Sequence, residues 1–127
     1  MEIVPYNGTT LAFIGDAIMS LKVREHLIKL GYQKPNDLQR KSEKWVSARA
    51  QANFLSALLE KSFFTEEELV IIKRGRNSRT ETIAKNADVA TYRMATGLEA
   101  IWGYYYLSNE LLRMEQLWHE IVLLGGQ

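Results

Sequence analysis

The chain has 127 residues, 46% of them hydrophobic, with no cysteine and a formal net charge of +1. This length suits a single domain, residues 1–127, and the lack of cysteine excludes disulfides, thiolate metal sites and a cysteine nucleophile. Because the net charge is near zero, any binding of nucleic acid would depend on a local basic patch. The sequence shows no signal peptide and no apolar run of about 20 residues, so we expect a cytoplasmic protein with no membrane span.

Apolar residues recur at helical spacing along most of the chain, and no alternating strand pattern is present. This periodicity predicts an all-α fold of five or six helices. The first helix is expected to be capped by Thr9 or Thr10 and to run to about Lys29. Gly31 then suits a left-handed residue after the helix end, and Pro35 opens a second helical region.

The middle of the chain predicts two more helices. The buried face of a third helix is predicted by residues that recur at steps of three and four: Trp45, Ala48, Ala52, Leu55 and Leu59. Thr65 and Glu68 form a T-x-x-E capping box, which starts a short fourth helix. Gly75 is expected to close this helix.

A polar segment separates these helices from the last two. Residues 75–88 lack helical period and predict a loop. Asp88 can cap a long helix that runs to about Leu107, and Ser108 can cap a last helix that ends near Gly125.

Two isolated carboxylates lie on the apolar helices. Asp16 is the only charged residue of "LAFIGDAIMSL", residues 11–21, and Glu99 is the only one of residues 94–109. Each shares its helix face with small residues, which allow two helices to approach closely: Ala12 and Ser20 beside Asp16, and Ala95, Thr96 and Gly103 beside Glu99. If these two faces cross, Asp16 and Glu99 lie next to each other.

The spacing leaves two interpretations of this pair open. Two adjacent carboxylates repel each other unless a cation lies between them, and Mg²⁺ prefers such hard oxygen ligands. Alternatively, each acid is a structural one that an arginine, a lysine or a helix N-terminus satisfies.

A local basic patch lies in "KRGRNSR", residues 73–79. A solvated charged loop is one interpretation of this run. Contact with RNA phosphates and riboses is the other, because no acid balances the run until Glu81. The candidate RNA-binding residues of the patch and of its return to the Glu99 helix are Arg74, Arg76, Asn77, Arg79, Lys85 and Asn86.

Two motifs resemble those of a known family. "LAFIGDA", residues 11–17, resembles the signature helix of the ribonuclease III catalytic domain, and "TGLEAIWGYYYL", residues 96–107, resembles its second motif. Over nearly the whole chain the resemblance is closer to the Mini-III ribonucleases, stand-alone bacterial forms without a double-stranded-RNA-binding domain. Further segments that resemble them are "KPNDLQRKSEKWVSARAQA", "FFTEEE", "KRGRN" and "KNADVATYR".

The resemblance implies an endoribonuclease that uses Mg²⁺, with Mn²⁺ as a substitute. Asp16 and Glu99 match the family's catalytic metal ligands, whereas Ala12 and Thr96 stand where the family's two other acids would be. No residue is assigned to any other cofactor. Phe13 matches an aromatic residue that inserts into a partner subunit, although core packing is the commoner role of such a residue.

The implied substrate is double-stranded RNA, cut to leave 5′-phosphate and 3′-hydroxyl ends. The implied protein is a two-fold homodimer that matures the 23S ribosomal RNA precursor in the bacterial cytoplasm, and a ribosomal protein that presents this substrate is a further candidate partner. A non-catalytic RNA-binding protein with this fold is the main alternative, and Ala12 and Thr96 favour it. A helical interaction module without an RNA role would leave both isolated carboxylates unexplained.

Overall fold

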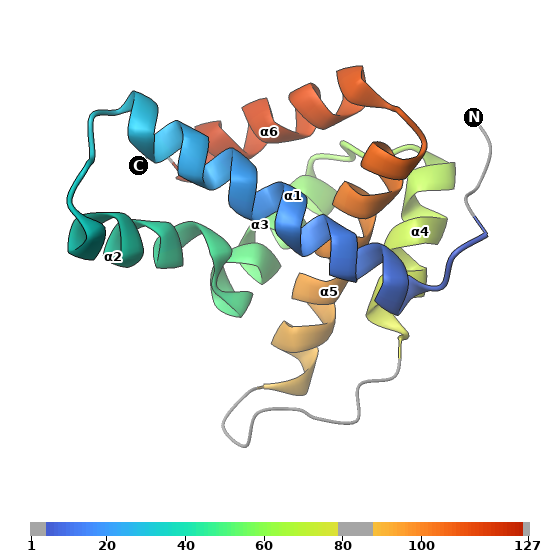
Figure 1. The fold of residues 1–127 in the computed structure, drawn as a ribbon. Helices are drawn as coiled ribbons and strands as arrows, with labels where there is room; N and C mark the ends of the chain where they lie inside the picture. The colour runs from blue at the N-terminus through green and yellow to red at the C-terminus, as the bar shows by residue number, and fades with distance from the viewer. Residues whose placement is uncertain (1–4, 79–87, 126–127) are drawn as a thin grey trace.

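A computed structural model describes residues 5–78 and 88–125 of the chain. These residues form six α-helices and no strand, which confirms the predicted all-α class (Figure 1). The helices are α1 (Gly8–Lys29), α2 (Pro35–Val46), α3 (Ala48–Glu60), α4 (Glu66–Arg76), α5 (Val89–Leu107) and α6 (Leu111–Gly125). No helix in the described ranges is long and apolar enough to cross a membrane.

The helix boundaries agree with local capping chemistry, with one correction at the start of α1. Asn7, rather than Thr9 or Thr10, caps α1, because its side chain accepts a hydrogen bond from the backbone N–H of Thr10 at 2.8 Å. Gly31 follows the helix with a φ of +101°, as predicted from the tolerance of glycine for left-handed backbone.

The third predicted helix is shorter at its start than the sequence suggested. Trp45 belongs to α2, since Ser47 interrupts the helical run with an extended ψ of 153°. The Ser47 side chain then accepts a hydrogen bond from the backbone N–H of Ala50 and so caps α3. Trp45 nevertheless contributes to the core that α3 also faces, because its ring packs against Phe54.

The later boundaries include one confirmed cap and one correction. Asp88 caps α5 by accepting a hydrogen bond from the backbone N–H of Ala90 at 3.0 Å. Ser108 does not start α6; it ends α5, and its N–H donates to the carbonyl of Tyr104. Asn109 then adopts a left-handed φ of 57°, a conformation that asparagine tolerates, and this turn delays α6 until Leu111.

Helix α5 is the centre of the molecule. It packs against α1, α3, α4 and α6, and α1 crosses in front of it in Figure 1. The middle of α5 is correspondingly buried, with Leu98, Ile101 and Trp102 fully inaccessible to solvent. Glu99 therefore lies on the most enclosed helix of the fold, on the side that α1 approaches.

Candidate active site

Asp16 and Glu99 lie side by side at the crossing of α1 and α5, as the spacing of small residues predicted. Glycines allow this contact: a Cβ on Gly15 would lie 1.7 Å from the carbonyl oxygen of Glu99, and one on Gly103 would lie 2.0 Å from that of Leu11. The two backbones are therefore in direct contact on both sides of the pair. The Asp16 side chain reaches the Glu99 carboxyl group within hydrogen-bonding distance.

The electrostatics of this pair are unfavourable for two negative charges. Burial, the hydrogen bond with Asp16 and the negative charge of Asp16 together raise the pKa of Glu99 to about 8, and burial is the largest of the three causes. Asp16 is exposed, whereas Glu99 is partly buried, so the site opens to solvent on the α1 side. Near neutral pH such a pair retains a proton or takes up a cation.

The alternative of two structurally satisfied acids finds no support in the described residues. No lysine or arginine of residues 5–78 or 88–125 forms an ion pair with Asp16 or Glu99. In the same ranges, no group of three or more histidine, aspartate or glutamate side chains is placed to hold a metal ion. The site therefore offers two carboxylates and a surplus of negative charge.

The positions of the family's two other acids add no carboxylate to the site. Ala12 and Thr96 are each 7% exposed. The Thr96 hydroxyl donates a hydrogen bond to the carbonyl of Tyr92 at 3.0 Å, so it is bound to its own helix. Both positions are therefore buried, and neither supplies a group for a metal ion.

The basic patch begins on α4 rather than in a loop. Gly75 does not close this helix, which continues to Arg76 and is capped by Asn77. Gly75 is instead a packing residue, since its Cβ would lie 2.7 Å from the Cβ of Ala100 on α5. The short distance between the helices, rather than a helix end, therefore requires glycine here.

The candidate RNA-binding residues differ in their surroundings. Arg76 and Asn77 are exposed at the end of α4. Arg74 is partly buried, and its Nη1 donates to the carbonyl of Tyr6 at 3.0 Å, so part of its guanidinium is engaged within the chain. Arg79, Lys85 and Asn86 lie outside the described residues.

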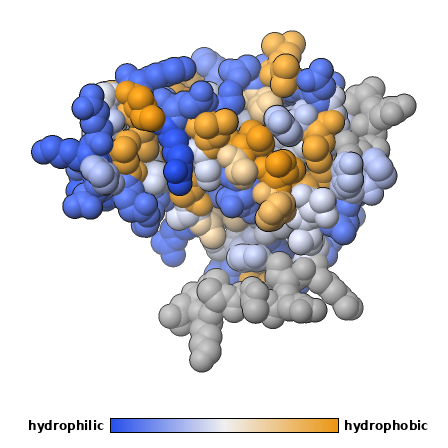
Figure 2. Space-filling model, viewed as in Figure 1, coloured by the Kyte–Doolittle hydropathy of each residue, from blue (hydrophilic) through white to orange (hydrophobic). Residues whose placement is uncertain are grey.

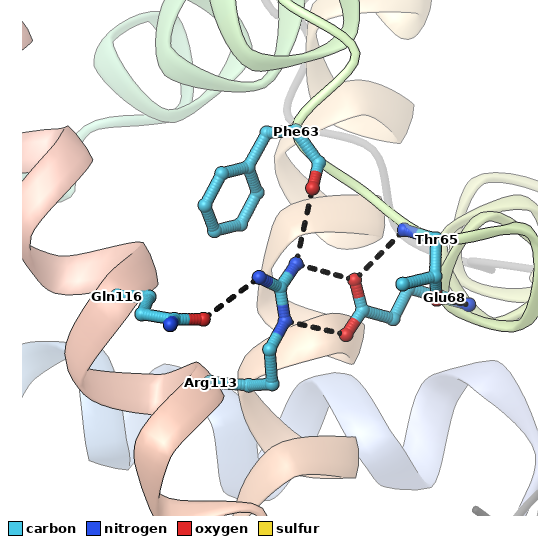
Figure 3. A network of polar contacts seen from close by, with 5 residues as sticks. All are labelled: Phe63, Thr65, Glu68, Arg113 and Gln116. Carbon is cyan, nitrogen blue, oxygen red and sulfur yellow. Dashed lines mark hydrogen bonds and ion pairs between the residues drawn. The ribbon is translucent and has the colours of Figure 1, made fainter.

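The other end of α4 is fixed by an ion pair that the sequence did not suggest (Figure 3). Glu68 is fully buried, and its two carboxylate oxygens accept hydrogen bonds from Nε and Nη2 of Arg113 at 2.9 and 2.7 Å. The same Arg113 donates to the carbonyl of Phe63. This ion pair links α4 to α6 and fixes the N-terminal part of α4, whose C-terminal end carries the basic patch.

Phe13 is 82% exposed in the chain, so the core interpretation of this residue is wrong. It projects from α1, three positions before Asp16, together with the exposed Leu21 and Ile28 of the same helix. Figure 2 shows apolar side chains gathered over α1 on this face of the molecule. A large apolar surface of this kind is typical of an interaction site.

Comparison with known proteins agrees with this architecture. The Ribonuclease III domain family matches residues 9–110. The chain is 50% identical to Mini-ribonuclease 3 of Enterococcus faecalis over 87% of this chain and 84% of the relative, and 51% identical to that of Streptococcus pneumoniae over 87% of each. A crystal structure of a Fusobacterium nucleatum protein superimposes with a TM-score of 0.82 at 32% identity, over 97% of this chain and 96% of the other. The chain thus belongs to the ribonuclease III family of endoribonucleases, within its Mini-ribonuclease 3 branch.

Proposed function

We propose that the chain is a Mg²⁺-dependent enzyme that hydrolyses phosphodiester bonds of double-stranded RNA and leaves 5′-phosphate and 3′-hydroxyl ends. The observation that carries this proposal is the contact between Asp16 and Glu99, two carboxylates that no described cation neutralises. Such a surplus of negative charge is unfavourable in a purely structural pair and favourable for a divalent cation.

The donor set fits a hard divalent cation. Asp16 and Glu99 would supply carboxylate oxygens, the ligands that Mg²⁺ prefers, and Mn²⁺ accepts the same ligands. When bound, Mg²⁺ supplies Lewis-acid activation of a water molecule and neutralises charge that develops on the phosphate oxygens. Because Ala12 and Thr96 add no carboxylate, we propose that the side chains hold one ion firmly before RNA arrives.

The two carboxylates have different tasks in this scheme. Glu99, which is partly buried on the central helix, fixes the inner side of the site, and the exposed Asp16 faces the incoming phosphate. Since the pKa of Glu99 is about 8 without a cation, Glu99 must release its proton when the site is loaded. Metal affinity should therefore increase with pH up to this value.

The proposed RNA contacts lie at the end of α4 and in the segment that follows it. Arg76 and Asn77 are exposed there, and Arg74, Arg79, Lys85 and Asn86 complete the proposed set. Guanidinium groups suit phosphates, and an asparagine side chain can donate to and accept from a ribose 2′-hydroxyl. Double-stranded RNA is bound through these groups rather than through its base edges.

We also propose that residues 1–127 act as one catalytic domain in a two-fold homodimer, in which Phe13 contacts the partner subunit. The exposure of this large aromatic side chain beside the catalytic pair supports a subunit contact. The proposed task is maturation of the 23S ribosomal RNA precursor in the bacterial cytoplasm, with a ribosomal protein as a candidate partner that presents the substrate. The Mini-ribonuclease 3 relatives named above come from bacteria, which supports this setting.

The experiment that tests the proposal is cleavage of a long RNA duplex with and without Mg²⁺. Asp16→Asn and Glu99→Gln should each lower the rate by at least about 10³-fold, which corresponds to roughly 4 kcal/mol in the barrier. Glu25→Gln is the matched control, because it removes one exposed negative charge from α1 away from the pair. Mg²⁺ should raise the Tm of the wild type and of this control, but not of Asp16→Asn.

The rival function is RNA binding without cleavage, and the two non-acidic positions, Ala12 and Thr96, are what favour it. It predicts that the wild-type protein binds the duplex and leaves it intact at all Mg²⁺ and Mn²⁺ concentrations. Cleavage that disappears in Asp16→Asn would exclude this rival. Cleavage at the wild-type rate in either carboxylate variant would overturn the assignment of the active site.

A further inference from the structure

Arg76 lies against α5 on the face that meets α4. A Cβ on Gly97 would lie 2.8 Å from Cγ of Arg76 and 3.2 Å from the carbonyl oxygen of Ile72. The aliphatic part of the Arg76 side chain therefore occupies the space that a larger residue at position 97 would fill. Gly97 precedes Glu99 by two positions, which is about 200° around a helix, so this contact places an exposed arginine on the α4 side of α5 rather than on the face that α1 meets.

A second exposed arginine lies on the same side of α5. Arg93 is four positions before Gly97, so it occupies the neighbouring turn of that helix face. The nearest acid of α5 is its cap, Asp88, whose carboxylate oxygens already accept hydrogen bonds from the Ala90 N–H and the Thr91 hydroxyl. Within the described residues, neither Arg76 nor Arg93 has an ion-pair partner.

We propose that Arg76 and Arg93 form a phosphate clamp that holds the RNA strand on one side of the Asp16–Glu99 site, with Gly97 as the residue that positions Arg76. This assignment rests on the proposed function and adds a substrate subsite to it. A guanidinium group binds phosphate oxygens through two parallel N–H donors, so two of them in adjacent positions suit a polyanionic strand.

The location of the clamp determines its task. Arg93 and Glu99 are six positions apart, which is about 9 Å along a helix axis and about 120° around it. At this separation the Arg93 guanidinium binds a phosphate that neighbours the cleaved bond rather than the reacting phosphate. The clamp should therefore govern the affinity and the register of the RNA strand, while the two carboxylates govern the chemical step.

The test measures duplex RNA affinity against salt concentration in the Asp16→Asn background, where no cleavage interferes. Arg76→Ala and Arg93→Ala should each weaken binding several-fold and lower the slope of log Kd against log salt by about one, because one fewer counterion is released. Lys29→Ala is the control: it removes one exposed positive charge at the far end of α1, and it should leave the slope unchanged (Figure 1).

Gly97→Ala separates positioning from general loosening of the fold. This variant keeps both arginines, but its methyl group displaces the Arg76 side chain, so binding should weaken about as much as in Arg76→Ala. The two changes should not add in the double variant, because both remove the same contact. Additive losses would mean that Gly97 acts only through helix packing, and they would overturn its positioning role.

Other outcomes distinguish this proposal from the one it rests on. A wild-type protein that neither binds nor cuts duplex RNA would overturn the proposed function itself. If the wild type cuts RNA and both arginine variants keep its affinity and salt slope, only the clamp is overturned, and an acidic protein surface becomes the better partner for these arginines.

Discussion

Two glutamates of the chain show how a neighbouring side chain decides the charge of a buried acid. Burial acts to raise the pKa of Glu68, but the hydrogen bond and positive charge of Arg113, with the backbone N–H of Thr65, bring it below its usual value. Burial raises the pKa of Glu99 in the same way, and its neighbour Asp16 adds to the increase. Glu68 is therefore a charged structural residue, whereas Glu99 lies beside a second carboxylate and holds its proton more strongly.

The raised pKa of Glu99 gives a pH-dependent prediction for stability. Its folded pKa of about 8 lies above the ordinary value of 4.5, so this group stabilises the folded state below pH 4.5 and loses that contribution as the pH rises to 8. The variant Glu99→Gln cannot ionise at this position, so it does not lose this folding stability as the pH rises. In EDTA, the Tm of the variant should exceed that of the wild type by at least about 4 °C at pH 8.5, the shift expected from roughly 1 kcal/mol.

The wild type and Glu99→Gln are compared across pH to test whether the pKa of Glu99 is raised. Thermal unfolding at pH 5, 6.5 and 8.5 should show a Tm difference that grows with pH. Addition of Mg²⁺ at pH 8.5 should raise the wild-type Tm and leave the Gln variant unchanged. A difference that stays constant from pH 5 to pH 8.5 would contradict the raised pKa.

Among individual residues, the sequence predicted the contact between Asp16 and Glu99 but not the polar contacts that fix α4. The contact was predictable because each acid is isolated on an apolar helix among small residues. The pairing of Glu68 with Arg113 was not, since the two are 45 positions apart and no periodic pattern relates them. The contact of Arg74 with the carbonyl of Tyr6 likewise depends on tertiary packing.

Helix contacts through glycine position the site at the scale of elements. Gly15 and Gly103 bring α1 against α5, and Gly75 and Gly97 bring α4 against α5. A glycine near the end of a helical run usually predicts a C-cap, which explains the wrong boundary predicted at Gly75. Whether such a glycine ends a helix or packs inside it depends on the helix opposite, and a single sequence does not reveal that helix.

Gly15→Ala tests the α1–α5 crossing. In an unobstructed helix this change stabilises a protein by about 1 kcal/mol, because alanine has the higher helix propensity. Here the new Cβ would lie 1.7 Å from the carbonyl oxygen of Glu99, so the helices must separate. We expect a net destabilisation of about 1–3 kcal/mol, the usual cost of overpacking, measured by urea unfolding.

The sign of the change in the free energy of unfolding distinguishes an unobstructed helix from a close crossing of α1 and α5. A Gly15→Ala variant more stable than the wild type would contradict the close crossing. RNA cleavage should also fall at temperatures where the variant remains folded, because the separation moves Asp16 away from Glu99. Retained cleavage in a destabilised variant would mean that the proposed active site tolerates the larger distance between Asp16 and Glu99.

For the whole molecule, the sequence predicted the fold class well and the exposure of apolar residues less well. Helical periodicity sufficed for an all-α fold, and the central place of α5 follows from its nearly uninterrupted apolar sequence. The same periodicity could not separate an exposed apolar residue from a buried one. Periodicity alone therefore favoured a core role for Phe13, whereas the family resemblance implied a subunit contact, and the fold places Phe13 on the outer face of α1.

Phe13→Ala tests whether this face is the subunit contact. A buried aromatic anchor at an interface contributes about 2 kcal/mol or more, so its truncation should weaken dimerisation by roughly 30-fold. Leu112→Ala is the matched control, since Leu112 is 72% exposed and projects from α6. In sedimentation velocity at micromolar concentration, Phe13→Ala should shift toward monomer while Leu112→Ala and the wild type remain dimeric.

Unfolding in urea gives a second measurement. Because Phe13 contributes little to the core of one chain, the unfolding midpoint of monomeric Phe13→Ala should be independent of protein concentration, whereas the midpoint of a dimer rises with concentration. A dimer that survives in Phe13→Ala would place the contact elsewhere, and dissociation of the Leu112 variant alone would move it to α6.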